Sequence, residues 1–196
     1  MGNFYVNFSV KSSDSRRVAE LIQGRRAFVT TPVSGWVLVG DELADMQYAP
    51  AIQGLSEMLS KQLKTYVLAV LNHDDDILVY LLYLNGEQID SYDSNPHYFD
   101  GGDTLSPPSG GQAEKLCTAF GSTAIAEVDK ILHAPVALNG TGSEQSKEYL
   151  FAYQRHLDLM KALGFPEVTV GLGYNYVSHG ELPKGLAREN ITFLEP

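Results

Sequence analysis

The sequence predicts one α+β domain with a mainly antiparallel sheet and helices on both of its faces. The elements expected in residues 1–100 follow the order strand, helix, strand, strand, helix, strand, which is typical of a ferredoxin-like unit, and a hairpin then adds a further strand. The segments Tyr66 to Leu71 and Ile77 to Leu84 are apolar without alternation, which indicates a sheet covered on both faces. With 196 residues, of which 44% are hydrophobic, the chain can bury one sizeable core.

Residues 1–100 carry the signals of a sheet-rich half. Ser13 or Asp14 can cap a first helix, and Pro50 starts a second helix at a position where its missing N–H is harmless. Asn85-Gly86 predicts a type I′ hairpin turn, because both turn residues need positive φ. The expected strands are Asn3 to Val10, Ala27 to Thr31, Trp36 to Val39, Tyr66 to Leu71, Ile77 to Leu84 and Gln88 to Tyr92. The last of these alternates, which places it near the sheet edge.

Residues 101–112 are rich in glycine and proline and predict a linker, and residues 113–196 predict a helical half that packs on the second face of the sheet. The expected helices are Ala113 to Phe120, Ile125 to Leu132, and a long helix capped by Ser143 and ending at Leu163. Gly164, Phe165 and Pro166 form a strong stop signal after that helix. Val168 to Leu172 is a candidate final strand.

Composition excludes several classes of protein. The formal net charge is -10, and no basic stripe is present, which argues against nucleic-acid binding. No apolar run reaches the length of a membrane span, and the first ten residues do not resemble a signal peptide. The single cysteine, Cys117, allows no internal disulfide and fits a reducing compartment. These observations predict a cytoplasmic protein without a membrane partner.

Negative charge is concentrated in one window of the chain. Residues 65–114 contain no Lys or Arg. The acids of this window are Asp74, Asp75, Asp76, Glu87, Asp90, Asp93, Asp100, Asp103 and Glu114. Most of them lie close to the apolar strand Ile77 to Leu84. One group is in the turn before this strand, and the other is at the end of its hairpin partner and in the loop that follows. In a simple hairpin these two groups fall at the same end of the sheet, so the sequence predicts one acidic edge.

Two kinds of chemistry suit this edge. Asp74, Asp76, Asp90 and Asp93 are candidate ligands for a divalent cation, since carboxylate oxygens are the preferred ligands of Mg²⁺ and Ca²⁺. His73 and His97 border the acids and are candidates for general acid or base catalysis. Plain alternatives are a solvated acidic turn at Asp74 to Asp76 and an Asx-turn at Asp93. The chain contains no nucleophile elbow, phosphate-binding loop or dinucleotide fingerprint, which favours a non-enzymatic protein.

We therefore expect a binding or regulatory protein, similar in kind to inhibitor and immunity proteins, whose acidic edge engages a basic protein partner. The candidate binding residues are Asp74, Asp75, Asp90, Asp93, Tyr98, Phe99, Asp100 and Asp103. The alternative function is a divalent-metal-dependent hydrolase that uses the clustered Asp and His residues. A homodimer formed through a tyrosine-rich surface is a third hypothesis, because tyrosine is enriched at interfaces. The aromatic residues considered for such a surface are Tyr80, Tyr83, Tyr92, Tyr98, Phe99, Tyr174 and Tyr176.

Overall fold

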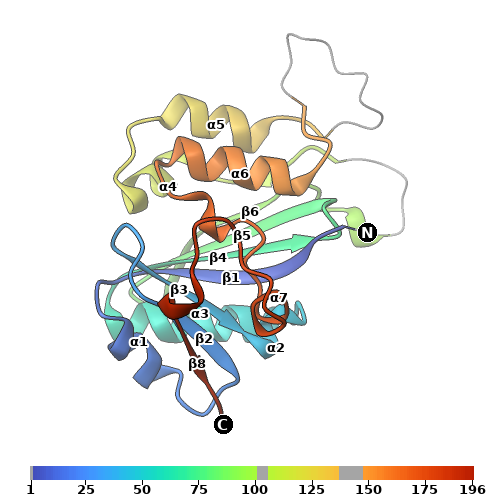
Figure 1. Ribbon diagram of the computed structural model, residues 1–196. Helices are drawn as coiled ribbons and strands as arrows, with labels where there is room; N and C mark the ends of the chain where they lie inside the picture. The colour runs from blue at the N-terminus through green and yellow to red at the C-terminus, as the bar shows by residue number, and fades with distance from the viewer. Residues whose placement is uncertain (1, 101–105, 137–147) are drawn as a thin grey trace.

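In the computed structural model, which describes residues 2–100, 106–136 and 148–196, one antiparallel sheet lies between two groups of helices (Figure 1). The eight strands in the described part of the chain have the order β7-β6-β5-β4-β1-β3-β2-β8. The strands are β1 (Phe4–Lys11), β2 (Ala27–Thr30), β3 (Trp36–Asp41), β4 (Tyr66–His73), β5 (Ile77–Leu84), β6 (Glu87–Asp93), β7 (Ser109–Gly110) and β8 (Ile191–Leu194). The prediction of an α+β fold with a mainly antiparallel sheet is therefore confirmed.

Seven α-helices and three short 3-10 helices complete the described part of the chain. The α-helices are α1 (Ser15–Leu21), α2 (Glu42–Asp45), α3 (Ala49–Leu63), α4 (Ala113–Phe120), α5 (Ile125–His133), α6 (Ala152–Ala162) and α7 (Tyr174–Ser178). The 3-10 helices are η1 (Tyr98–Asp100), η2 (Glu167–Thr169) and η3 (Arg188–Asn190).

Two apolar clusters fill the space between the sheet and the helices. On one face, Val18 of α1 and Leu55 of α3 pack with strand residues such as Phe8. On the other face, Leu116 of α4 and Leu159 of α6 pack with strand residues that include Leu82. This double cover is the reason that β4 and β5 are apolar on both sides, since each strand buries residues on both of its faces.

Local signals position several elements as expected. Asp14 accepts the backbone N–H of Arg17 and caps α1. Asn85 and Gly86 have φ of 55° and 89°, as a type I′ hairpin turn requires. At the end of α6, Gly164 has a φ of 69°, and Phe165 N–H donates to the Met160 carbonyl at 2.9 Å. The Gly164 N–H also donates to the Lys161 carbonyl at 3.0 Å, and the two bonds together form a Schellman motif, so the predicted stop signal is confirmed.

Other predictions are wrong in the second half. Tyr149 does not lie in a helix, because its N–H bonds the Pro135 carbonyl at 3.0 Å and it forms a bridge with Val136. Helix α6 consequently begins at Ala152, and the predicted cap Ser143 lies outside the described residues. Residues 168–172 form no strand: they belong partly to η2 and partly to the turn after it. The final strand is β8, which pairs with β2.

Candidate functional site

The turn between β4 and β5 presents three consecutive aspartates at one end of the sheet. Asp74 and Asp75 have φ of 53° and 61°, and Asp76 N–H donates to the His73 carbonyl at 3.0 Å, which closes the turn. Asp74 Oδ1 accepts the Gly2 N–H at 3.0 Å. The remaining two carboxylates are also engaged, but by groups from different parts of the chain.

Asp75 and Asp76 form hydrogen bonds that connect the turn to other segments of the chain. Asp75 Oδ2 accepts from the Asn3 amide at 2.8 Å, and the Asp75 carbonyl accepts the N–H of Ala152, the first residue of α6, at 2.6 Å. Asp76 Oδ2 accepts from the Tyr98 hydroxyl at 2.8 Å. The turn therefore holds together the start of the chain, the start of α6 and the loop after β6.

The loop after β6 reaches the same end of the sheet. Antiparallel pairing sets Asp93, the last residue of β6, opposite Val79 near the start of β5. Asp93 Oδ1 accepts the Asn95 N–H at 2.8 Å, as in an Asx-turn, and burial raises the pKa of the Asp93 carboxyl. His97 and Asp100, which follow, are exposed and form an ion pair at 2.8 Å when the imidazole is protonated.

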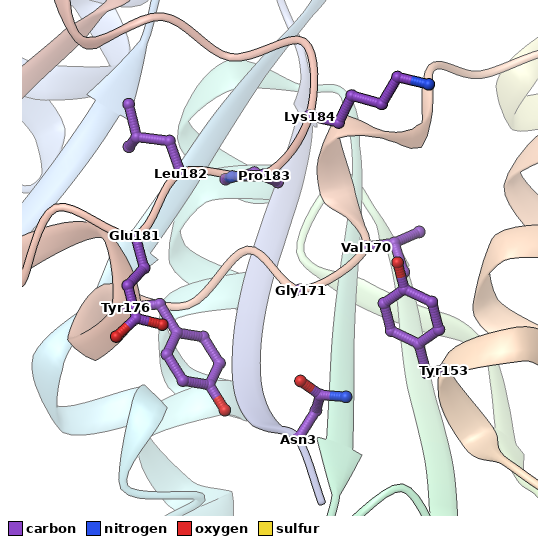
Figure 2. A pocket seen from close by; sticks show the side chains of 9 residues that line it. All are labelled: Asn3, Tyr153, Val170, Gly171, Tyr176, Glu181, Leu182, Pro183 and Lys184. Atoms are coloured by element: carbon purple, nitrogen blue, oxygen red, sulfur yellow. The ribbon is translucent and has the colours of Figure 1, made fainter.

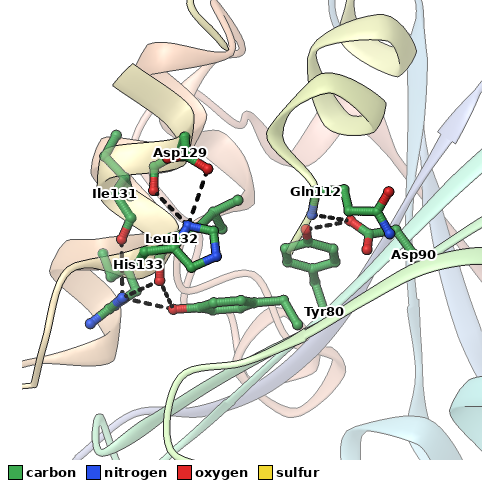
Figure 3. A network of polar contacts seen from close by, with 9 residues as sticks. Tyr80, Asp90, Gln112, Asp129, Ile131, Leu132 and His133 are labelled. Atoms are coloured by element: carbon green, nitrogen blue, oxygen red, sulfur yellow. Dashed lines mark hydrogen bonds and ion pairs between the residues drawn. The ribbon is translucent and has the colours of Figure 1, made fainter. Parts of the chain in front are cut away.

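Asp90 lies apart from the other predicted site residues. Its side chain is buried, and its Oδ2 accepts from the Tyr80 hydroxyl at 2.7 Å and from the Gln112 N–H at 2.9 Å (Figure 3). Gln112 is the residue before α4, so Asp90 fixes that helix to the sheet. Asp90 therefore does not face solvent with the other acids, and Asp103 lies outside the described residues.

Aromatic side chains surround His73 beside the acidic turn. The rings of Phe4 and Phe99 meet the imidazole edge-on, with centroids 4.9 Å and 5.1 Å away. Phe4 is 41% exposed and Phe99 is 74% exposed, so both present apolar surface to solvent. His73 Nδ1 lies 2.5 Å from Gln47 Oε1. The hydrogen bond to Asp76, together with burial and the charges of Asp76 and Asp74, raises the pKa of Tyr98 to about 12.

We call this region the sheet-end face and define it by Phe4, His73, Asp74, Asp75, Asp76, Asp93, Tyr98, Phe99 and Asp100. More exposed apolar side chains flank it. Met46 and Tyr48 lie on either side of Gln47, whose amide also donates to the Asn72 carbonyl at 2.8 Å. Leu150, Phe151 and Tyr153 lie at the start of α6, beside the bond from Ala152 to Asp75. Seven of the nine exposed large apolar residues in the described part of the chain thus either belong to the sheet-end face or lie within two residues of a residue that hydrogen-bonds it.

Sequence reasoning found the acids, Tyr98 and Phe99 but missed Phe4, the residues between α2 and α3, and the residues at the start of α6. Phe4 joins the face because β1 pairs with β4 in a register that sets Phe4 opposite His73. No local pattern in the sequence encodes that register. Tyr80 and Tyr92, members of the predicted tyrosine-rich dimer surface, are instead buried and stacked with centroids 5.3 Å apart.

The candidate metal ligands do not form a coordination group. Within residues 2–100, 106–136 and 148–196, no three His, Cys, Asp or Glu side chains are gathered as a cation site. Asp74 and Asp76 accept hydrogen bonds from protein donors, and Asp90 accepts one from the N–H of Gln112 at the start of α4. The two candidate catalytic histidines have different surroundings, since His73 contacts Gln47 and aromatic rings whereas His97 contacts Asp100.

Comparisons with protein families, with curated proteins and with solved structures gave no match. Within the described ranges, none of the helices has the length and apolar character needed to cross a membrane.

Proposed function

We propose that this protein is a non-enzymatic binding or regulatory protein of the inhibitor or immunity kind, and that it engages a basic protein through the sheet-end face. The observation that carries this proposal is the combination of exposed aromatic side chains with exposed carboxylates. Phe99 and Phe4 supply apolar contact area, and Asp74, Asp76 and Asp100 supply charge around them. Interfaces concentrate binding energy in such central aromatic residues, with polar groups at the rim.

The charge of the surrounding chain supports a basic partner. Residues 65–114 contain nine acids and no Lys or Arg, so β4, β5, β6 and their loops contribute only negative formal charge. A field of one sign accelerates the encounter with an oppositely charged protein and makes the association weaker at high salt.

The face is also held in place before binding. Hydrogen bonds from Gly2, Asn3 and Tyr98 fix the Asp74 to Asp76 turn to two other segments. A surface fixed in this way loses little conformational entropy on association.

A panel of small basic proteins, with acidic proteins of similar size for comparison, tests the proposal by calorimetry at low and high salt. We expect at least one basic protein to bind, with an affinity that falls as salt rises. A face variant carrying Asp74→Asn, Asp76→Asn and Asp100→Asn should weaken that binding at least tenfold, and Phe99→Ser should do the same without changing charge.

A charge-matched variant serves as the control. Glu57→Gln, Glu127→Gln and Glu189→Gln remove the same number of exposed charges away from the face. If this control weakens binding as much as the face variant, or if no basic protein binds, the proposal is wrong.

The remaining expectations are proposals of narrower scope. The β4-β1-β3-β2 order of the first four strands of the chain supports a ferredoxin-like unit that β5 and β6 extend. The free, buried thiol of Cys117 supports a location in the reducing cytoplasm. A thermal-shift screen with Mg²⁺, Mn²⁺, Ca²⁺ and Zn²⁺ tests the metal-dependent hydrolase, which needs one of these ions to stabilise the fold.

A further inference from the structure

A cavity of about 250 Å³ adjoins the sheet-end face (Figure 2). Its lining comes from the start of the chain, from α6 and from residues 170–184, and it includes Asn3, Tyr153, Gly171, Tyr176 and Glu181. The cavity is smaller than the usual range for drug-sized ligands, about 300–1,000 Å³, so it suits one side chain rather than a nucleotide.

Hydrogen bonds connect the cavity to the face. The Asn3 amide donates to Asp75, and the Tyr176 hydroxyl accepts the N–H of Phe4 at 3.1 Å. Tyr153 follows Ala152, whose N–H bonds the Asp75 carbonyl. A partner that covers the Asp74 to Asp76 turn and Phe4 therefore lies next to the cavity opening.

The chemistry of the lining favours a cation. Tyr153 and Tyr176 contribute aromatic rings, which attract cations through their faces. Glu181 contributes a carboxylate that forms no ion pair within the described part of the chain. Lys184 also lines the cavity, but its ammonium points away from it in Figure 2.

A second carboxylate lies behind Asn3. Asp75 Oδ1 is shut off from solvent and has no hydrogen-bond partner among the described residues, although Oδ2 of the same group is bonded to Asn3. A buried carboxylate oxygen without a donor is unusual in folded proteins, and this carboxylate is one hydrogen bond away from Asn3 of the cavity lining.

We propose that the cavity receives an arginine side chain of the basic partner, an inference that rests on the proposed function. A planar guanidinium stacks on tyrosine rings and donates several hydrogen bonds in a fixed fork. A lysine ammonium is a compact charge without this planar geometry. Glu181 and the Asn3 side-chain carbonyl are the acceptors on opposite parts of the lining. Arginine is also enriched among the side chains that dominate interface energies.

Blocked arginine, N-acetyl-arginine methylamide, tests the cavity without the partner. Titrations followed by NMR should give a dissociation constant in the millimolar range, with shifts at Tyr153 and Tyr176. The neutral isostere, blocked citrulline, should bind at least fivefold more weakly, and blocked lysine should be weaker than arginine. Equal affinity for arginine and citrulline, or no saturable binding of arginine, overturns the proposal.

Variants locate the binding. Glu181→Gln should weaken blocked arginine at least fivefold, and Tyr153→Ala should weaken it without changing charge. Glu189→Gln, an exposed site on the same stretch of chain, should leave the affinity unchanged. Equal effects of the changes at Glu181 and Glu189 overturn the assignment, and the amide spectrum of each variant verifies that it is folded.

The same variants separate this inference from the proposed function. If a basic protein binds and depends on Asp74, Asp76 and Asp100, but Glu181→Gln changes neither that binding nor the arginine titration, only the arginine inference fails. If blocked arginine binds in the cavity but no basic protein depends on the sheet-end face, the proposed function fails and the cavity remains an arginine site.

Discussion

His156 should make the fold sensitive to mild acid. This residue of α6 has no exposed surface, and its Nδ1 lies 2.8 Å from the Tyr5 hydroxyl. Its Nε2 is buried and has no hydrogen-bond partner among the described residues. Burial lowers the pKa of the imidazole from 6.5 to about 3. The unfolded chain therefore takes up a proton near pH 6.5, whereas the folded protein does so only near pH 3, and stability falls as the pH decreases between these values.

The size of the effect follows from the difference between the two pKa values. Each pH unit below 6.5 lowers the free energy of unfolding by about 1.4 kcal/mol. Lowering the pH from 7 to 5 should therefore reduce it by about 2 kcal/mol. For a protein of this size that corresponds to a fall in Tm of roughly 4–8 °C. Burial also raises the pKa of the Asp45 and Asp93 carboxyls, and their protonation acts in the opposite direction, since it stabilises the folded state as the pH falls. A comparison of the wild type with a His156 variant isolates the histidine, because both proteins contain these carboxyls.

Urea unfolding followed by Trp36 fluorescence at pH 5, 6 and 7 measures the effect. We expect His156→Gln to be less stable than the wild type at pH 7 but to lose about 2 kcal/mol less between pH 7 and 5. His179→Gln, which changes an exposed histidine, should retain the pH dependence of the wild type. An NMR titration that places the His156 pKa near 6.5, or a His156→Gln variant with unchanged pH dependence, would refute the argument.

Three further substitutions test the contacts that hold the elements together. Arg155→Met removes a buried guanidinium that donates to the carbonyls at the end of α5 and should cost about 3 kcal/mol in urea unfolding; a loss below 1 kcal/mol would contradict this role. Asp90→Asn weakens the attachment of α4 and should cost about 1–2 kcal/mol, with faster hydrogen exchange at the Gln112 amide; unchanged exchange would contradict it. Gly86→Ala places a side chain on a residue whose φ is 89° and brings its Cβ to 2.9 Å from Lys61 Cβ. We expect the free energy of unfolding to fall by about 1–2 kcal/mol, and a neutral result would contradict the turn geometry.

The sequence predicted those parts of the fold that depend on neighbouring residues. Asn85 and Gly86 specify their turn because both must adopt positive φ, and Gly164 ends α6 for the same reason. The apolar strands β4 and β5 also reveal that both faces of the sheet are covered, because burial acts on every residue along them. Such signals remain visible without knowledge of the partner element.

Long-range contacts decided what could not be predicted. Asp90 resembles the other acids in sequence, but α4 docks over it and Tyr80 bonds it, so it is structural. Helix α6 begins later than predicted because the Tyr149 backbone pairs with the segment after α5 rather than continuing a helix. The acids, Tyr98 and Phe99 of the candidate site were therefore predicted, whereas Phe4 and the aromatic residues at the start of α6 became visible only when β1 and α6 were placed beside the turn.

The contact between Tyr98 and Asp76 allows the geometry of the sheet-end face to be tested separately from its charge. Asp76→Asn keeps an oxygen that accepts from the Tyr98 hydroxyl but removes the negative charge. The pKa of Tyr98, raised to about 12 by its hydrogen bond to Asp76, by burial and by the charges of Asp76 and Asp74, should therefore fall part of the way towards 10 in this variant because the charge of Asp76 is lost, and ¹³C NMR of labelled tyrosine can measure the change. Asp100→Asn removes a charge that does not contribute to this shift and should leave the Tyr98 pKa unchanged. If the Tyr98 pKa is near 10 in the wild type, the loop after β6 is not held against the turn, and the preorganised face on which partner binding depends does not exist.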